Sequence, residues 1–377
     1  MTRYIVLFLI FLGCCLALME RLTVAPPPVQ AEISLQEALS DKSGKFAEVT
    51  PGRSFRFPAD HGPHREYKTE WWYFTGNLAN EKGEQFGYQL TLFRVGNLIP
   101  SEQNENPSEW ASQSLYMGHL GLSDVARERF FTRERLGREG VGLAGALENG
   151  ERVWLEDWEI RRQPGGWELS ARSDELELAL KLADTKPPIL QGEGGYSRKG
   201  PDSKHASYYV SQTRLKTSGL ITVEGVEHRV TGASWFDHEW SSEAMAEGLV
   251  GWDWFSLQLN DQSELMLYLL RYEDGRLEPA SSGTVVAPDG SKQALKLQDF
   301  VVESAETQKV ESGNVYPSRW RVKVPPVGLQ LEVVPKMAEQ EMSGRVPYWE
   351  GAVKVEGSRN GQPIEGHGFV ELTGYGR

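Results

Sequence analysis

The sequence predicts an all-β fold in which two related β domains, each a sandwich or a barrel, follow an N-terminal signal segment. Three observations lead to this prediction. Apolar and polar residues alternate with a period of two along many short segments, turn residues separate these segments, and the two halves of the chain are similar. With 377 residues, the chain is long enough for two domains of ordinary size.

The first segment has the features of a secretory leader. Arg3 precedes an apolar run from Tyr4 to Leu12, and small or apolar residues dominate as far as Met19. This stretch is shorter than the roughly 20 apolar residues that span a bilayer, which disfavours a permanent membrane anchor. We therefore expect an exported protein of the periplasm or cell envelope.

Two processing routes are open. Residues 29–31 have the small-x-Ala form of a signal-peptidase site, which favours cleavage after Ala31, whereas Cys14 ends an imperfect lipoprotein box. Both cysteines lie in the leader, so the mature chain forms no disulfide under the favoured route. We assign residues 1–31 to the signal peptide and 32–49 to a linker with a short capped helix.

Alternation identifies the clearest strands. Leucine occupies every second position from Leu176 to Leu182, which places leucine on one face of a strand. Residues 320–324 and 327–333 repeat this pattern on either side of two prolines. Turn residues recur between such segments, at 81–83, 148–150, 164–166, 274–275, 289–290 and 359–361. Many short strands with frequent turns are typical of sandwiches and barrels.

Internal similarity indicates a duplication. Trp71–Leu78 aligns with Trp252–Leu259, and Leu90–Arg94 aligns with Leu267–Arg271 at a similar distance downstream. If the halves are related, Trp71 and Trp252 fall on equivalent strands. Chance similarity between aromatic-rich strands is the alternative.

The duplication sets the expected domain boundaries. We predict an N-terminal β domain over residues 50–234 and a C-terminal β domain over residues 235–377. Under the favoured cut neither domain contains a cysteine, so packing alone has to stabilise both.

Three tryptophan-rich blocks carry a resemblance to a known family. They are Phe57–Gly62 leading into Thr69–Gly76, then Trp235–Ser241, then Gly251–Phe255. In this order they resemble the family of exported, lipocalin-like proteins that includes the carotenoid 1,2-hydratases (CrtC-type) and the AttH-type proteins labelled "predicted secreted hydrolase". The likeness covers most of residues 55–375. It implies two lipocalin-like antiparallel β-barrel domains packed together, with a ligand cavity at or near one barrel.

The resemblance also implies an apolar ligand, because the hydratases of this family add water to a terminal alkene of carotenoids. We expect a protein that binds, and hydrates or otherwise transforms, an apolar polyene- or lipid-like molecule in a β-barrel cavity, without a cofactor. One alternative is a non-catalytic envelope protein that carries a lipid. A hydrolase is the third reading, and the absence of Gly-x-Ser-x-Gly and His-Glu-x-x-His motifs counts against it.

The charge balance bounds the partners. A formal net charge of -13 argues against a nucleic acid or an anionic membrane surface, because phosphate binding needs clustered lysine and arginine. We expect an apolar small molecule or lipid as the partner, and a peripheral association with the cell envelope is compatible with the leader.

The candidate catalytic residues are Asp237, His238 and Glu239. In a strand, Asp237 and Glu239 share one face and His238 and Trp240 share the other. Hydrating an isolated alkene needs an acid, a cation-stabilising environment and water. A buried carboxylic acid with a raised pKa donates at neutral pH, and indole faces stabilise a cation by ~1 to 2 kcal/mol. With Asp237 as the donor, the candidate ligand-binding residues are Trp71, Tyr73, Trp235, Trp240, Trp252, Asp253 and Trp254.

Structural roles are the alternative for these residues. The carboxylates could accept hydrogen bonds from indoles, amides or arginine and lock the domains together. His61, His64 and Glu70 suit a metal by type, but a Gly-Pro pair separates the histidines, so we predict a hydrogen-bonded loop and no metal site. The glycine-rich segment Gly192–Gly200 is predicted to be either a lid over a barrel mouth or a plain connector.

Overall fold

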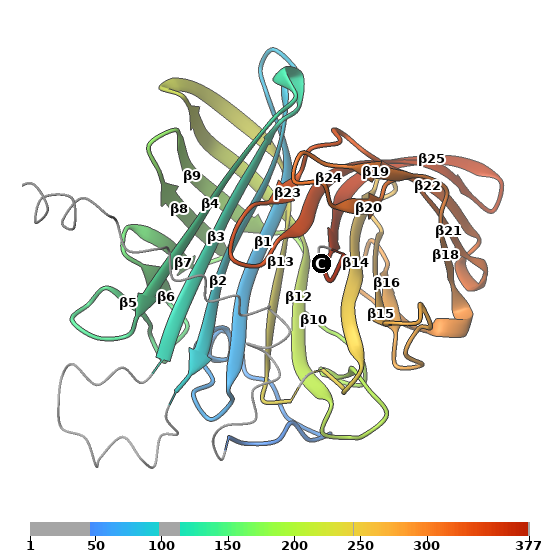
Figure 1. Ribbon diagram of the computed structural model, residues 1–377, viewed down its shortest axis with the longest axis horizontal. Coiled ribbons are helices and arrows are strands. Elements are labelled where there is room, and N and C mark those ends of the chain that lie inside the picture. Colours follow the sequence, from blue (N-terminus) through green and yellow to red (C-terminus); the bar gives the residue numbers. More distant parts are fainter. Residues whose placement is uncertain (1–45, 98–113, 244, 376–377) are drawn as a thin grey trace, which may run out of the picture. The chain divides into compact units, whose positions relative to one another are not determined.

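The computed structural model describes residues 46–97, 114–243 and 245–375. Strands dominate these ranges, and they form two large antiparallel sheets that curl into barrel-like domains, which confirms the predicted fold class (Figure 1). The predicted leader, its processing sites at Cys14 and Ala31, and most of the predicted linker lie outside the described residues. Within the described ranges no helix has the length and apolar character needed to cross a membrane.

The first sheet is formed by the chain up to Ser241. Its strands are β1 (Thr69–Asn80), β2 (Gln85–Gly96), β3 (Ser114–Asp124), β4 (Arg129–Arg138), β5 (Ala144–Ala146), β6 (Arg152–Leu155), β7 (Trp158–Gln163), β8 (Gly166–Arg172), β9 (Leu176–Asp184), β10 (Ile189–Leu190), β11 (Tyr196–Arg198), β12 (Ala206–Val223) and β13 (Val226–Ser241). The order across the sheet is β4-β3-β2-β1-β13-β12-β9-β8-β7-β6-β5, and β10 and β11 pair with β12.

The second sheet begins at Leu249. Its strands are β14 (Leu249–Leu259), β15 (Glu264–Tyr272), β16 (Ser282–Val286), β17 (Lys292–Lys296), β18 (Val301–Ser304), β21 (Trp320–Val324), β22 (Leu329–Pro335), β23 (Glu341–Met342), β24 (Tyr348–Arg359) and β25 (Gln362–Leu372). They run in the order β17-β16-β15-β14-β25-β24-β22-β21-β18, with β23 beside β24. A separate hairpin joins β19 (Thr307–Lys309) and β20 (Val315–Pro317), and short 3-10 helices lie at Ala59–His61, Val125–Arg127, Leu297–Asp299 and Pro325–Val327.

The two sheets place the aligned tryptophans on equivalent strands. In the first sheet β1 lies between the next strand, β2, and the last strand, β13; in the second, β14 lies between β15 and β25 in the same way. Trp71 stands opposite Phe93, and Trp252 stands opposite Leu270, which is the register that the internal alignment predicts. The predicted equivalence of Trp71 and Trp252 is therefore confirmed.

The chain changes sheet between Ser241 and Leu249. The domain boundary that we predicted, between Ser234 and Trp235, lies inside β13, which stays paired with β1 as far as Ser241. The tryptophan-rich block that resembles the family is thus the end of the last strand of the first sheet.

Each sheet encloses its own apolar core, and a third apolar cluster lies between the sheets. Trp72 and Phe74 point into the first core, and Phe255 and Trp320 into the second. Tyr73 on β1 and Trp254 on β14 point to the opposite faces of these two strands and belong to the third cluster. Strand β9 alternates buried and exposed residues as its leucine pattern predicts.

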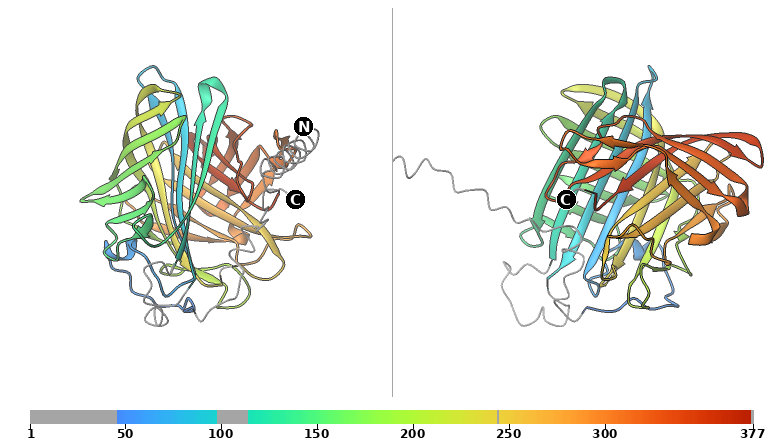
Figure 2. Two further views of the ribbon diagram at one scale, coloured as in Figure 1. Left: turned by 60° about the vertical axis from the view of Figure 1, so that its left-hand side comes forward. Right: turned by 45° about the vertical axis from the view of Figure 1, so that its right-hand side comes forward.

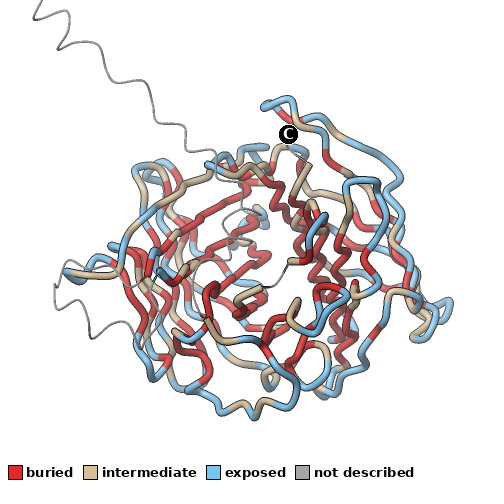
Figure 3. The backbone as a smooth tube through the Cα atoms, turned by 60° about the horizontal axis from the view of Figure 1, so that its bottom comes forward, coloured by how far each residue is buried: buried red, intermediate tan, exposed pale blue. Residues whose placement is uncertain are grey.

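This arrangement is visible in three views. Figures 1 and 2 show the first sheet, coloured blue to yellow, beside the second, coloured yellow to red. In Figure 3 the buried residues follow the strands of both sheets, and many exposed residues lie in the connecting loops. Central strands such as β1 and β14 are buried on both faces, one against a barrel interior and one against the other sheet.

Candidate functional site

A cavity of about 850 Å³, part of it open to solvent, lies between the two sheets. The expected position was the inside of a barrel, but aromatic and aliphatic side chains fill both interiors, so this cavity is bounded by the outward faces of the barrels. The first sheet contributes Trp71, Tyr73, Thr91, Phe93, Asp237 and Glu239, and the second contributes Trp252, Trp254, Tyr268, Leu270, Tyr348 and Glu371. Lys199, Tyr209 and Met245 complete the lining.

Six of the ten predicted site residues line this cavity. They are Trp71, Tyr73, Asp237, Glu239, Trp252 and Trp254. The predicted division of strand faces holds, because Asp237 and Glu239 face the cavity while His238 and Trp240 face away from it.

The other four predicted residues lie outside the lining. His238 and Trp240 belong to a buried group on the opposite face of β13. Asp253 points to the opposite face of β14, where it accepts hydrogen bonds from Arg271 Nε and Tyr375 OH, both at 2.9 Å. The Trp235 ring packs edge-on against Trp254, with 6.1 Å between their centroids. Period-two alternation explains why His238, Trp240 and Asp253 point away from the cavity. Trp235 shares the strand face of Asp237, to which its indole donates, and lies just beyond the lining.

Asp237 accepts hydrogen bonds from three side chains. The donors are Ser211 Oγ at 2.5 Å, Tyr209 OH at 2.5 Å and Trp235 Nε1 at 2.7 Å. Burial raises the pKa of Asp237 to about 7, although these three donors favour the carboxylate and limit the rise. Tyr209 OH in turn accepts from Trp254 Nε1 at 3.0 Å. Asp237 therefore orders side chains that shape the cavity wall.

Glu371 is a third acid in the cavity, after Asp237 and Glu239, and the sequence analysis missed it. Burial raises its pKa to about 8, with a further contribution from the negative charges of Asp237 and Glu239, against a hydrogen bond from the Trp252 indole. Its side chain is only partly buried, on the last strand, β25. Glu371 therefore presents a carboxyl group that is mostly protonated at neutral pH.

The internal symmetry relates these two acids. Asp237 stands opposite Tyr73 on the β13–β1 pair, and Glu371 stands opposite Trp254 on the β25–β14 pair. Since Tyr73 and Trp254 are aligned in the duplicated strands, Asp237 and Glu371 occupy equivalent positions. Extending the internal alignment to the last strand of each half is the sequence signal that could have identified Glu371.

A fully buried carboxyl group lies behind the cavity wall, next to Glu371. Glu350 on β24 stands opposite Glu371 on β25. Burial and the proximity of Glu371 raise the pKa of Glu350 well above its usual range. Its Oε1 accepts a hydrogen bond from the Tyr73 OH at 2.6 Å. This pairing keeps protons on the acids at the Glu371 end of the cavity.

A lysine also reaches the cavity, again without having been predicted. Lys199 Nζ lies 3.1 Å from Glu239 Oε1 and 4.0 Å from the centre of the Tyr268 ring. Burial alone would lower the pKa of Lys199, but the charge of Glu239 and the proximity of Tyr268 raise it, so the amino group stays charged. Lys199 comes from the glycine-rich segment Gly192–Gly200, which is thus more than a plain connector.

Three buried groups are the metal-ligand candidates among the described residues. His64, Glu70 and His238 place their ligand atoms within 4.8 Å of one another. Arg94 Nε already lies 3.0 Å from Glu70 Oε2, and His64 Nε2 lies 3.2 Å from Asp60 Oδ1. A divalent ion here would adjoin the Arg94 guanidinium in a fully buried position, so we assign these groups to a hydrogen-bonded lock. His61, which we had considered with them, is not part of this set.

Comparisons with other proteins agree with this fold. The sequence model described as AttH-like matches residues 48–375. An AttH-type protein from Nitrosomonas europaea is 34% identical, with a TM-score of 0.79 over 88% of this chain and 100% of that chain. Kievitone hydratase from Nectria haematococca is 15% identical, with a TM-score of 0.66 over 90% of this chain and 98% of that chain. A search of curated proteins found no match.

Proposed function

Because this chain belongs to the AttH-like family, we propose that it binds an apolar, polyene- or lipid-like molecule between its two sheets and adds water to a carbon–carbon double bond of that molecule. One observation carries the proposal: Glu371 presents a carboxyl group with a pKa of about 8 to a cavity lined by indole and phenyl rings. A protonated acid beside apolar, electron-rich rings is the combination that alkene hydration needs.

The proposed reaction follows from these groups. The carboxyl proton of Glu371 is transferred to one alkene carbon, and the electron pair of the double bond forms the new C–H bond. The cation on the other carbon lies among the faces of Trp71, Trp252 and Trp254, which stabilise positive charge. A water oxygen bonds to the cation, and its surplus proton returns to the Glu371 carboxylate. The sum is alkene plus water giving alcohol, and the same acid serves the reverse dehydration.

The residues that we first proposed as catalytic have other roles in this scheme. Asp237 fixes Tyr209 and, through it, Trp254. Glu239 balances the charge of Lys199. His238 belongs to the buried lock around Glu70 and positions the end of β13 from the far face.

A carrier without catalysis is the second candidate. The observation that favours it is that both carboxylates on the first-sheet side of the cavity, Asp237 and Glu239, already have hydrogen-bond or ion-pair partners among the protein's own side chains. The same cavity would then hold an apolar molecule unchanged. The name of one structural neighbour, kievitone hydratase, favours hydration over this reading.

Export belongs to the same proposal. The apolar leader supports a place of action in the periplasm or cell envelope, with lipidation at Cys14 as the variant route. N-terminal sequencing of protein from the envelope fraction tests this: a start after Ala31 or at a lipidated Cys14 agrees with it, and an intact Met1 contradicts it.

The function is tested with two substrates in water enriched in heavy oxygen. Full-length protein is incubated with lycopene, and separately with the lipids that co-purify with it from native membranes, and products are identified by mass spectrometry. We expect an alcohol that carries one heavy oxygen. Glu371→Gln should still quench tryptophan fluorescence on binding but lose about 10²- to 10⁴-fold in turnover, as expected for removal of a general acid.

Asp237→Asn is the matched control. It changes the equivalent acid on the first sheet. We expect it to lower the melting temperature but to change turnover little at a temperature where the variant is folded. Full turnover by Glu371→Gln overturns the assignment of the acid. Tight binding of both substrates with no product overturns hydration and establishes the carrier.

A further inference from the structure

We infer that the molecule bound between the sheets is electrically neutral and carries an acceptor oxygen that hydrogen-bonds to Lys199, an inference that rests on the proposed function and specifies its ligand class. The proposed reaction uses the Glu371 end of the cavity and leaves Lys199 without a role. A buried ammonium group inside a ligand cavity requires an explanation, because its desolvation is costly.

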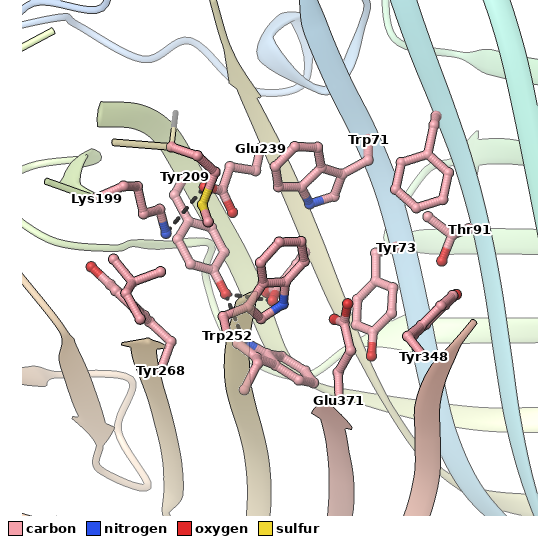
Figure 4. A pocket seen from close by; sticks show the side chains of 15 residues that line it. Trp71, Tyr73, Thr91, Lys199, Tyr209, Glu239, Trp252, Tyr268, Tyr348 and Glu371 are labelled. Atoms are coloured by element: carbon pink, nitrogen blue, oxygen red, sulfur yellow. Dashed lines mark hydrogen bonds and ion pairs between the residues drawn. The ribbon is translucent and has the colours of Figure 1, made fainter. Parts of the chain in front are cut away.

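The cavity has two chemically different ends. In Figure 4, Lys199 and Tyr268 lie at one end, Glu371, Tyr73 and Tyr348 lie at the other, and Trp252 lies between them. An elongated molecule lying along the indole therefore reaches the acid with one part and the lysine with another.

Lys199 has donor capacity left for a ligand. Its side chain is almost enclosed, since the residue is only 8% exposed. An ammonium group has three N–H donors, and the ion pair with Glu239 Oε1 at 3.1 Å uses one. The rings of Tyr209 and Tyr268 lie 4.9 and 4.0 Å from Nζ and offer only their faces. The remaining donors need an oxygen acceptor, which a ligand in this cavity can supply.

The charges of the cavity favour a neutral ligand. The charges of Lys199 and Glu239 cancel each other, and Glu371 is mostly protonated at neutral pH. Asp237, whose pKa is about 7, adds a partial negative charge, which disfavours an anionic ligand further. An anionic head group near Lys199 would also lie against Glu239, and a cationic one would lie against Lys199 itself. A carbonyl, ether or hydroxyl oxygen meets neither repulsion.

The position of Lys199 is fixed by contacts with both sheets. Just before it, Ser197 Oγ lies 3.1 Å from Tyr268 OH on β15, and Tyr268 OH donates to the Arg198 carbonyl at 2.9 Å. Glu239 on β13 holds the amino group from the other side and also accepts from Ser207. Lys199 is therefore a preorganised donor, because these contacts exist without a ligand.

Two neutral dyes test the inference on the full-length protein. Prodan carries a carbonyl whose emission moves to longer wavelength on hydrogen bonding, whereas phenylnaphthylamine has no carbonyl. We expect both dyes to bind. Lys199→Met should weaken Prodan binding about tenfold and shift its bound emission to shorter wavelength, while phenylnaphthylamine affinity changes less than about twofold, since one charge-assisted hydrogen bond is lost. The anionic dye anilinonaphthalene sulfonate should bind more weakly than Prodan.

Two further variants guard against misfolding. Lys199→Met leaves Glu239 buried without its partner, so the double variant Lys199→Met with Glu239→Gln removes both charges and should show the same selective loss of Prodan. Lys204→Met is the matched control, because Lys204 pairs with Glu243 at 3.0 Å outside the cavity lining and should leave both dyes unaffected.

Several results would overturn the inference. The first is a Prodan affinity that is unchanged both in Lys199→Met and in the double variant. The second is an equal loss of affinity for the two neutral dyes. The third is a sulfonate dye that binds the unaltered protein more tightly than Prodan does and loses this affinity in Lys199→Met. Failure of the unaltered protein to bind either neutral dye contradicts the proposed function instead, because the cavity would then not accept apolar molecules at all.

Discussion

Two acids that line the cavity at equivalent positions behave differently because their neighbours differ. Asp237 is surrounded by three side-chain donors, which make it a structural acceptor. Glu371 faces another carboxyl, Glu350, and a single indole donor, which leaves its proton available. Equivalent strand positions therefore carry an acid in both halves of the chain, and the surrounding residues decide its chemistry.

The raised pKa values predict an unusual pH dependence of stability. In the folded chain the pKa of Asp237 is about 7 instead of 3.8, and that of Glu371 is about 8 instead of 4.5. Between about pH 4 and pH 8 the folded state therefore binds more protons than the unfolded state, so these two groups lower the free energy of unfolding as pH rises through this range. Each contributes a slope of up to about 1.4 kcal/mol per pH unit.

Urea unfolding at several pH values checks this prediction. The double variant Asp237→Asn with Glu371→Gln should lose that part of the slope, so that its stability falls less than that of the unaltered protein from pH 5 to pH 8. Parallel curves for the two proteins would show that neither acid holds its proton in the folded chain.

At the scale of one element, the segment that leads into β11 determines where Lys199 lies. Gly192 and Gly194 both have a left-handed backbone, with φ of +60° and +59°. A Cβ on Gly192 would lie 2.3 Å from the Tyr196 carbonyl oxygen, whereas a Cβ on Gly194 would meet no atom within 4 Å. Of these two residues, only Gly192 has to be glycine because of a close approach, which is that of its own backbone to the backbone of Tyr196.

This contrast predicts the effects of two alanine substitutions. Gly194→Ala should cost about 1 kcal/mol, the strain of a left-handed alanine. Gly192→Ala should cost more and should weaken Prodan binding as Lys199→Met does, because Tyr196 and the residues after it have to move. Thermal unfolding and dye titration measure both effects. Equal effects of the two substitutions would contradict the proposed role of this segment.

At the scale of the whole described chain, a buried polar cluster fastens the second sheet to the first. Glu264 on β15 is fully buried and accepts from Lys186 Nζ at 2.7 Å, Arg214 Nε at 2.6 Å and Thr213 Oγ1 at 3.0 Å. All three donors belong to the part of the chain that forms the first sheet. Strand β15 also carries Tyr268 and Leu270 of the cavity lining.

Neutralising Glu264 should therefore be strongly destabilising. Glu264→Gln leaves two buried cations without their carboxylate, and we expect a loss of about 3 to 5 kcal/mol in the free energy of unfolding. Glu332→Gln is the control, because its ion pair with Arg319 at 3.1 Å is well exposed and should contribute only about 0 to 1 kcal/mol. Urea denaturation compares them, and similar small losses would show that the cluster does not hold the sheets together.

The sequence alone determined the strands and the orientation of their side chains. Period-two alternation predicted β9, and it separated Asp237 and Glu239 from His238 and Trp240. The internal alignment predicted that Trp71 and Trp252 are equivalent, since a repeated pattern of apolar residues fixes both the strand and its register.

The tertiary structure alone decided where the cavity lies and which polar groups enter it. Both faces of the central strands are apolar, so alternation does not distinguish the face that fills a barrel from the face that meets the other sheet. Lys199 and Glu371 reach the cavity through contacts between distant segments, and no local pattern marks them. Alternation is a property of neighbouring residues, whereas a cavity between sheets arises from long-range packing. The sequence therefore identified the strands but missed two of the four acidic and basic side chains that line the cavity, Lys199 and Glu371.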